Sequence, residues 1–183
     1  MTYTKQTLQQ DLAAMGLTGT ETILIHSSMK SIGAVEGGAD TVLDALMEFF
    51  AEGLLLLPTH TWQSIDQDHP VFDVRRSPCC VGILPELFRQ RPGVVRSLHP
   101  THSIAACGRG AAEYLAGELE NNTPCTPGGC YARLRAVGGK ILLLGVSQQL
   151  LLVLFGLLLV GGAAGSSLGG HIAPLCLRVG QGR

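Results

Sequence analysis

Charged and aromatic residues are scarce in this sequence of 183 residues, and both shortages limit what the protein can bind. Only 15% of the residues are Asp, Glu, Lys or Arg, the formal net charge is −1, and 5% of the residues are aromatic. Proteins that bind nucleic acids carry a basic patch or stripe and aromatic rings on which bases stack. The scattered cations and few rings of this chain therefore indicate that nucleic acid is not a partner.

The cysteines follow no metal-binding or disulfide pattern. They are Cys79, Cys80, Cys107, Cys125, Cys130 and Cys176. No two of them form a C-x-x-C pair, so we expect free thiols. His99 and His102 flank a proline, but no Cys or carboxylate has the spacing to complete a zinc site of three or four ligands. The sequence therefore predicts no bound metal.

The first sixteen residues, MTYTKQTLQQDLAAMG, lack the pattern of a signal peptide. They are polar and amphipathic, without the cationic region and apolar core that such a peptide needs. We therefore expect a cytoplasmic protein. The length suits one domain with its own core, and no repeat or linker is visible. The sequence predicts a single domain over residues 1–183.

The C-terminal part of the chain has an unusual composition. No Asp, Glu, Lys or Arg occurs between Lys140 and Arg178, and residues 150–160 are apolar except for Gly156. A membrane-spanning helix needs roughly 20 consecutive apolar residues, and this run is shorter and leads into a glycine-rich stretch. We expect a segment that does not span a membrane. A protein anchored in a membrane by residues 150–164 is the alternative.

Hydrophobic periodicity predicts alternating helices and strands. Helices are expected over residues 4–15, 39–50, 83–89 and 111–119. Strands are expected over residues 22–25, 54–57, 103–107 and 140–146. A long polar loop over residues 59–77 is of the kind that carries binding groups. This order predicts a layered α/β/α fold, in which helices flank a largely buried sheet.

The loop after the first expected strand is a candidate ligand site. It reads HSSMKSIGAVEGGA over residues 26–39. Glycines let the backbone approach a ligand closely, and free N–H groups at a helix start attract anions. The loop matches neither G-x-G-x-x-G nor G-x-x-x-x-G-K-[ST]. Its spacing alone therefore allows a phosphate-bearing ligand or an ordinary turn from a strand into a helix.

Several ordered motifs, this loop included, resemble the aminoglycoside 3-N-acetyltransferase family. They are TILIHSSMKSIGAVEGGAD at residues 22–40, LLLLPTHTW at 54–62, PVFD at 70–73, RPGVVRSLHPTHSIAA at 91–106 and TPCTPGGCYARL at 123–134. The resemblance implies the layered sheet of that family. It also implies an acetyl-coenzyme A dependent enzyme that acetylates the 3-amino group of an aminoglycoside or a similar amine, by direct attack of the amine on the thioester.

The resemblance also implies which residues form the site. Toward coenzyme A it places His26, Ser27, Ser28, Lys30, Ser31, Gly33, Val35, Thr101, His102 and Ser103. Toward the acceptor it places His60, Trp62, Asp66 and Asp73. A ring face and carboxylates on that side can receive a polycationic sugar.

The resemblance ends at Val146. Family members continue into N-T-x-x-H-x-x-E, whose His and acidic residue act as the base and its orienting partner. This chain continues with SQQ and the apolar stretch, where His171 is the only histidine and no carboxylate follows it. We therefore expect a family member truncated at its C-terminus and assign no catalytic residue. A catalytically inactive member that at most binds coenzyme A is the alternative.

Overall fold

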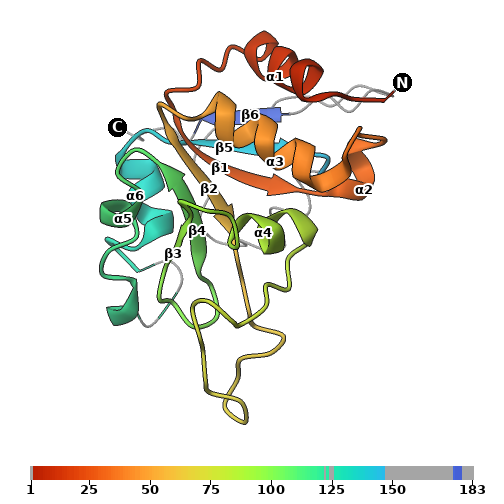
Figure 1. The fold of residues 1–183 in the computed structure, drawn as a ribbon. Coiled ribbons are helices and arrows are strands. Elements are labelled where there is room, and N and C mark those ends of the chain that lie inside the picture. The colour runs from red at the N-terminus through yellow and green to blue at the C-terminus, as the bar shows by residue number, and fades with distance from the viewer. Residues whose placement is uncertain (1, 122, 124–125, 147–174, 179–183) are drawn as a thin grey trace.

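The computed structural model describes residues 2–121, 123, 126–146 and 175–178. Its six strands form one mixed sheet in the order β3-β4-β2-β1-β5-β6, as Figure 1 shows. The strands are β1 (Thr22–Ser27), β2 (Leu54–Pro58), β3 (Val95–Arg96), β4 (Ile104–Gly108), β5 (Lys140–Leu144) and β6 (Leu175–Arg178). The helices are α1 (Lys5–Ala14), α2 (Met29–Ile32), α3 (Gly38–Phe49), α4 (Ile83–Phe88), α5 (Ala111–Tyr114) and α6 (Cys130–Ala136), with a 3-10 turn η1 (Glu118–Glu120).

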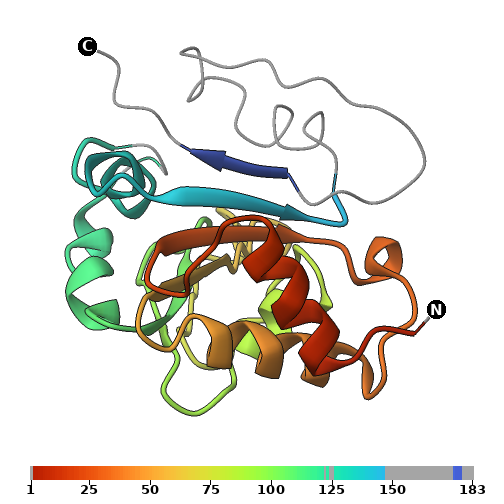
Figure 2. The ribbon, with the colours of Figure 1, turned by 90° about the horizontal axis from the view of Figure 1, so that it is seen from above.

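The central strand β1 pairs in parallel with a neighbour on each side. Ile23 lies opposite Leu55 of β2, and Ile25 lies opposite Leu142 of β5. The other pairs, β2 with β4, β3 with β4 and β5 with β6, are antiparallel, and Figure 2 shows β6 outside β5. Because β1, β2 and β5 run in the same direction, their carboxyl ends meet at one edge of the sheet.

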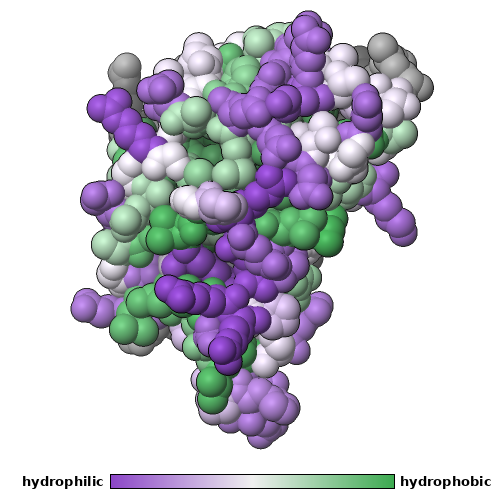
Figure 3. Space-filling view, viewed as in Figure 1, coloured by the Kyte–Doolittle hydropathy of each residue, from purple (hydrophilic) through white to green (hydrophobic). Residues whose placement is uncertain are grey.

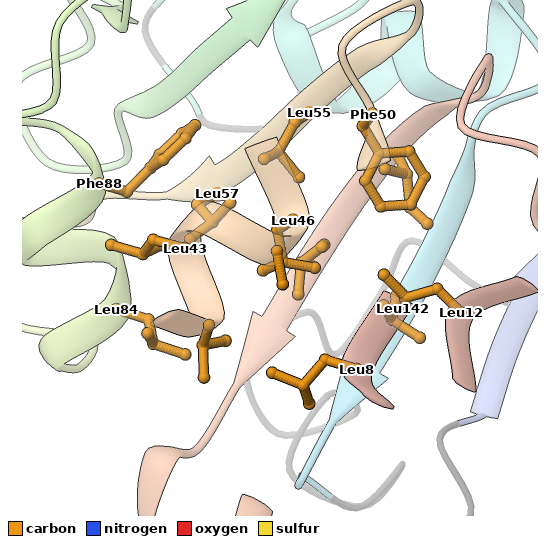
Figure 4. Close-up of a cluster of buried hydrophobic side chains, with 14 of the residues drawn as sticks. Leu8, Leu12, Leu43, Leu46, Phe50, Leu55, Leu57, Leu84, Phe88 and Leu142 are labelled. Atoms are coloured by element: carbon orange, nitrogen blue, oxygen red, sulfur yellow. The ribbon is translucent and has the colours of Figure 1, made fainter. Parts of the chain in front are cut away.

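Alternate side chains of the strands enter two separate apolar clusters. On one face, Ile23 and Ile25 pack with residues of α1, α3 and α4, and Figure 4 shows this cluster around Leu46. On the other face, Leu24 packs with residues of α5 and α6, including Leu134. Helices therefore cover both faces of the sheet, which confirms the predicted layered α/β/α fold.

The helix predicted over residues 4–15 is confirmed as α1, whose start is fixed by a capping box. The Thr4 hydroxyl accepts a hydrogen bond from the Thr7 backbone N–H at 3.2 Å, and the Thr7 hydroxyl accepts one from the Thr4 N–H at 2.8 Å. These bonds satisfy two backbone donors that a helix start leaves without partners. The spacing of Leu8 and Leu12 then turns one face of α1 onto the core.

The continuous helix predicted over residues 111–119 is wrong. Helix α5 ends at Tyr114, and Gly117 adopts a left-handed conformation with φ of 82° before η1 begins. A residue in this conformation cannot continue a right-handed helix, so the chain turns at the glycine. The sequence also did not predict α2, β3, α6 and β6, which have between two and seven residues each.

Two predictions about thiols and membranes are tested only in part. Cys79, Cys80, Cys107 and Cys130 are free thiols. Within the ranges that the structure describes, no helix is both long enough and apolar enough to cross a bilayer. Residues 150–164, to which the alternative of a membrane anchor applied, lie outside those ranges.

The end of β5 packs tightly against the turn that follows β1. The Ser28 backbone N–H donates to the Leu144 carbonyl oxygen at 2.9 Å. Gly145 comes next, with φ of 73°, and a Cβ atom on it would lie 2.8 Å from the Ser28 carbonyl oxygen and 3.1 Å from the Ile32 nitrogen. The lack of a side chain at position 145 therefore allows this close approach.

Replacing Gly145 should destabilise the fold. Gly145→Ala is expected to lower the free energy of unfolding by about 2 to 4 kcal/mol, because the cost of a left-handed alanine adds to the steric clash. Gly138→Ala is the control, since Gly138 also has positive φ, of 63°, but no atom within 4 Å of the added Cβ. That variant should lose only about 1 to 2 kcal/mol. Urea unfolding measures both, and equal losses would contradict the explanation.

Candidate functional site

A recess lies at the edge of the sheet where the carboxyl ends of β1 and β2 meet, the arrowheads of these strands in Figure 1. Its polar lining consists of His26 and Ser27 at the end of β1 and His60 just after β2. Its apolar lining consists of Ile25, Pro58, Val81, Pro85 and Val146. Open α/β sheets bind ligands at the carboxyl ends of their strands, so this recess is the candidate site.

Two polar atoms in the recess are buried without a hydrogen bond. Ser27 Oγ and His60 Nδ1 have no hydrogen-bond partner among the residues that the structure describes. A buried donor or acceptor without a partner costs about 1 to 3 kcal/mol, and native proteins contain few of them. The recess is therefore suited to a ligand whose polar atoms supply the partners.

His60 lies at the centre of a cluster of rings. Its Nε2 forms a short hydrogen bond with the hydroxyl of Tyr131 on α6. Its ring centroid lies 4.5 Å from that of Trp62 and 5.0 Å from that of His102, and the last two rings are 5.3 Å apart. These contacts hold together α6, the loop after β2 and the loop before β4.

The loop before β4 is shaped by His99. Its Nδ1 accepts hydrogen bonds from the backbone N–H groups of Thr101 at 3.3 Å and His102 at 3.1 Å, so the proton of the neutral ring lies on Nε2. The Thr101 hydroxyl also bonds to His102 Nδ1 at 2.9 Å. A backbone bond of 3.0 Å from the Thr61 N–H to the Thr101 carbonyl ties this loop to the one after β2. Thr101 and His102 therefore lie beside His60.

The four histidines of this region are neutral at pH 7. Burial lowers the pKa of His26 to about 4. Burial, followed by the neighbouring imidazoles and Arg96, lowers the pKa of His60 to about 2. Burial also lowers the pKa of His99 and of His102. Neutral imidazoles donate and accept hydrogen bonds without adding positive charge to the site.

Arg96 fixes the loop after β2 against the sheet. Its buried guanidinium donates to the carbonyl oxygens of Thr59 and Ser77, both at 2.7 Å, and to Ser103 Oγ at 3.0 Å. The ring of Phe72 covers it, with the guanidinium carbon 5.1 Å from the ring centroid. Burial lowers the pKa of Arg96 to about 10, which leaves it charged at neutral pH. This one side chain thus joins both ends of the loop to the start of β4.

Ser103 lies inside the protein and does not line the recess. Its side chain is fully buried, and its Oγ donates to the Thr59 carbonyl at 2.7 Å while accepting from Arg96. Its hydroxyl is therefore used within the protein. The loop before β4 contains three residues predicted to contact coenzyme A. The other two, Thr101 and His102, are more exposed than Ser103.

The other residues predicted for coenzyme A lie on the turn around α2. The hydroxyls of Ser28 and Ser31 are 3.2 Å apart, and Lys30 is exposed beside them. Gly33 follows α2 with φ of 99°, and Val35 forms a bridge with Tyr3 that fixes the end of the turn. The turn leads directly from His26 and Ser27 in the recess, so hydroxyls and an ammonium group lie next to the candidate site.

The carboxylates predicted for the acceptor lie on the outer part of the loop after β2. Asp66 and Asp73 each accept hydrogen bonds from the backbone N–H groups two and three residues further along the chain, at 2.7 to 3.0 Å. These bonds lower the pKa of both carboxyls and form local turns. Neither residue lines the recess. Figure 3 shows that the surface at the tip of this loop is largely hydrophilic.

Metal ligands do not gather in this region. Over the described ranges, no group of three or more His, Cys, Asp or Glu side chains is placed to hold an ion. His99 uses its Nδ1 for backbone N–H groups of its own loop, which leaves only Nε2 for any other contact.

A family model described as aminoglycoside 3-N-acetyltransferase matches residues 24–151 of this chain. A curated relative, aminoglycoside N(3)-acetyltransferase VII of Streptomyces paromomycinus, is 36% identical over 169 residues. The alignment covers 82% of this chain and 58% of the relative. The chain thus spans less than two thirds of that protein's length.

Solved structures give the same result. The aminoglycoside acetyltransferase AAC(3)-Xa is 36% identical with a TM-score of 0.76, over 84% of this chain and 60% of that one. AAC-IIIb, solved in a binary complex with CoASH, is 28% identical with a TM-score of 0.66, over 78% of this chain and 59% of that one. The fold of the described residues is therefore that of these proteins.

Acid should destabilise the protein between pH 6.5 and about pH 4. Unfolded histidine titrates near pH 6.5, whereas the folded-state pKa is about 4 for His26 and about 2 for His60. The unfolded state therefore binds more protons in this range, and stability falls as the pH falls. Each of these two histidines lowers the free energy of unfolding by about 1.4 kcal/mol for each pH unit below 6.5. Urea unfolding over this pH range measures the slope.

His60→Gln should reduce that slope by the contribution of one proton. His69→Gln is the control, because His69 lies exposed on the outer loop, away from the buried rings around His60. A slope in His60→Gln equal to that of the control would contradict the assignment.

Weakening the Arg96 contacts should loosen the loop after β2. Arg96→Lys keeps the charge but loses several hydrogen bonds, and is expected to cost about 2 to 4 kcal/mol of stability. Trp62 is the only tryptophan in the sequence, so its emission should shift to the red. Trypsin should also cleave faster after Arg75 and Arg76 in the loop.

Arg91→Lys is the matched control for Arg96→Lys. Arg91 forms ion pairs with Asp40 and Asp44 of α3, away from the loop. It should therefore change neither the Trp62 emission nor the cleavage at Arg75 and Arg76. The same emission and cleavage in both variants would show that Arg96 does not hold the loop.

Proposed function

This chain belongs to the aminoglycoside 3-N-acetyltransferase family, and we propose that it binds acetyl-coenzyme A and transfers the acetyl group to an aminoglycoside or a similar amine. The acceptor group is the 3-amino group, which attacks the thioester directly. The proposal includes one acetyltransferase-like domain over residues 1–183 and a cytoplasmic location. It includes neither a metal nor a nucleic-acid partner.

The composition of the recess is the observation that carries this proposal. His26 and Ser27 belong to the motif assigned to coenzyme A, and His60 belongs to the motif assigned to the acceptor. These motifs are far apart in the sequence, yet all three residues line one recess. Transfer of an acetyl group requires the thioester and the amine to meet, and holding them together accounts for much of such a rate enhancement.

Coenzyme A is proposed to lie along the turn around α2. The Ser28 and Ser31 hydroxyls and the Lys30 ammonium supply donors for its phosphates, with the backbone of Gly33 and Val35 beside them. Thr101 and His102 are proposed to flank the arm that leads to the thioester. We assign Ser103 to the support of these residues, because its hydroxyl bonds to Thr59 and Arg96.

The charge of the site favours a polycationic acceptor. The neutral imidazoles around His60 add no positive charge that would repel it. Trp62 offers a ring beside His60 at the start of the long loop, and Asp66 and Asp73 are ionised on the outside of that loop. Ring faces and carboxylates both attract ammonium groups.

The reaction needs an acceptor for the proton that the amine loses, and we assign this role to no residue. The sequence after Val146 does not contain N-T-x-x-H-x-x-E. A protein that binds coenzyme A but transfers acetyl groups very slowly is therefore the second candidate function, and this sequence observation favours it. His171 lies outside the described residues.

Coenzyme A should bind to the wild type and bind more weakly to Ser28→Ala/Ser31→Ala. The variant loses two hydroxyl donors, and hydrogen bonds to charged groups contribute about 1 to 3 kcal/mol, or roughly 5- to 150-fold in Kd. Isothermal titration calorimetry measures the affinity. Thr18→Ala/Thr20→Ala is the matched control, because it removes another exposed pair of bonded hydroxyls, in the loop that precedes β1. Absence of heat with folded wild type would overturn the proposal.

Acetyl transfer to aminoglycosides should be very slow in this chain. A missing positioned base typically costs about 10²- to 10⁴-fold in rate. A thiol-release assay with acetyl-coenzyme A and several aminoglycosides measures turnover. Turnover at ordinary enzyme rates that disappears in His171→Ala would contradict the expectation and identify the base. Ordinary turnover that survives this change would show that a residue other than His171 supplies the base.

A further inference from the structure

The two buried polar atoms belong to residues at the ends of two different strands, and both residues line the recess. Ser27 is the last residue of β1, and His60 follows β2 by two positions. Both side chains line the recess, and neither Ser27 Oγ nor His60 Nδ1 has a partner within the described part of the chain. A pair of such atoms at one site indicates a ligand atom that accepts two hydrogen bonds.

We assign the Tyr131 hydroxyl as the donor in its hydrogen bond with His60 Nε2. When the Tyr131 hydroxyl donates to Nε2, the proton of the neutral ring must lie on Nδ1. The rings of Trp62 and His102, at 4.5 and 5.0 Å, hold the imidazole in its orientation. The Nδ1–H group is thereby a fixed donor.

We propose that the Nδ1–H of His60 and the hydroxyl of Ser27 together bind the carbonyl oxygen of the acetyl thioester and stabilise the negative charge that develops on it. The inference rests on the proposed function. It assigns to these two residues the role of an oxyanion hole and makes Tyr131 a positioning residue, which acts through His60.

Each donor keeps its proton during the reaction. The amine nitrogen attacks the carbonyl carbon, a C–N bond forms, and one electron pair of the carbonyl moves onto oxygen, where the two donors stabilise it. When the carbonyl re-forms, the C–S bond breaks. Sulfur leaves with the electron pair and receives the proton that the amine has lost, which gives an amide and free coenzyme A. Fixed donors aimed at such an oxygen need no reorganisation, and one such donor is typically worth about 10²- to 10³-fold in kcat.

The low pKa of His60 suits a hydrogen-bond donor and does not suit a general base. Burial and the neighbouring imidazoles lower its pKa far below 7, so the ring stays neutral and has little tendency to accept a proton. A neutral imidazole can still donate through Nδ1–H. It also avoids placing a full positive charge beside a cationic acceptor.

Isotope-edited infrared spectroscopy tests the inference without any turnover. Acetyl-coenzyme A labelled with ¹³C at the carbonyl is bound to the wild type without an acceptor. Two hydrogen bonds to the carbonyl oxygen should shift its stretching band to a lower wavenumber than in free acetyl-coenzyme A. Ser27→Ala should lose part of that shift. Ser64→Ala should retain all of it, because Ser64 is an exposed serine outside the recess, with its hydroxyl bonded to the Thr61 carbonyl.

Two substitutions of His60 distinguish the contribution of Nδ1 from that of Nε2. An asparagine amide nitrogen lies near the position of Nδ1, and a glutamine amide nitrogen lies near that of Nε2. His60→Asn should therefore keep much of the shift and His60→Gln should lose most of it. Tyr131→Phe should weaken the shift as well, because the phenol no longer favours the proton on Nδ1.

Titration calorimetry with coenzyme A controls for folding. Coenzyme A has no thioester carbonyl, so measurable binding shows that a variant is folded, and its Kd should be unchanged in Ser64→Ala. A full carbonyl shift in both Ser27→Ala and His60→Gln would overturn the inference. So would an unshifted band in wild type that binds acetyl-coenzyme A, although the proposed function would then still stand. Failure of the wild type to bind either molecule would overturn both.

Discussion

The parallel pairing of β1 with both neighbours is the constraint on which the site depends. Ile23 and Ile25 fix the register of β1 against β2 and β5, and the same side chains fill the core beneath α1 and α3. A shift of β1 by one residue would move these side chains to the opposite face. It would also turn Ser27 away from the recess. One register of β1 therefore places both the core side chains and Ser27. A substitution that shifts this register would alter the core and the site together.

The site contains one buried cation and several neutral rings. Arg96 is surrounded by carbonyl and hydroxyl oxygens, which satisfy its donors without an opposing full charge. Burial is the largest cause of the low pKa of His60, and the field of the nearby guanidinium adds to it. The main role of Arg96 is therefore to order the loop after β2.

Much of the fold follows from local sequence patterns, and much of the site does not. The periodicity of Leu8 and Leu12 and the apolar run of β2 predicted their elements, because burial on one face or on two imposes those patterns. Helix α6 was not predicted, since its turn and cap depend on tertiary contacts of Glu118 with the Cys130 N–H. The motifs predicted His26, Ser27 and His60, which line the recess, and also Ser103, Asp66 and Asp73, which do not. The motifs did not show that Arg96 and Tyr131 support the site, since each acts on residues distant in sequence.

The polar atoms without partners could not be predicted, because the lack of a partner is a property of the whole folded structure. A buried donor moves toward any available acceptor unless its side chain is held, and the rings around His60 and the β1 register behind Ser27 hold both in place. Gly145 contributes at the same edge, since its bare backbone lets β5 support the turn that begins at Ser28. The rigid neighbours thus hold the two donors in place before any ligand binds. A ligand that accepts both hydrogen bonds removes the cost of leaving these donors buried without partners.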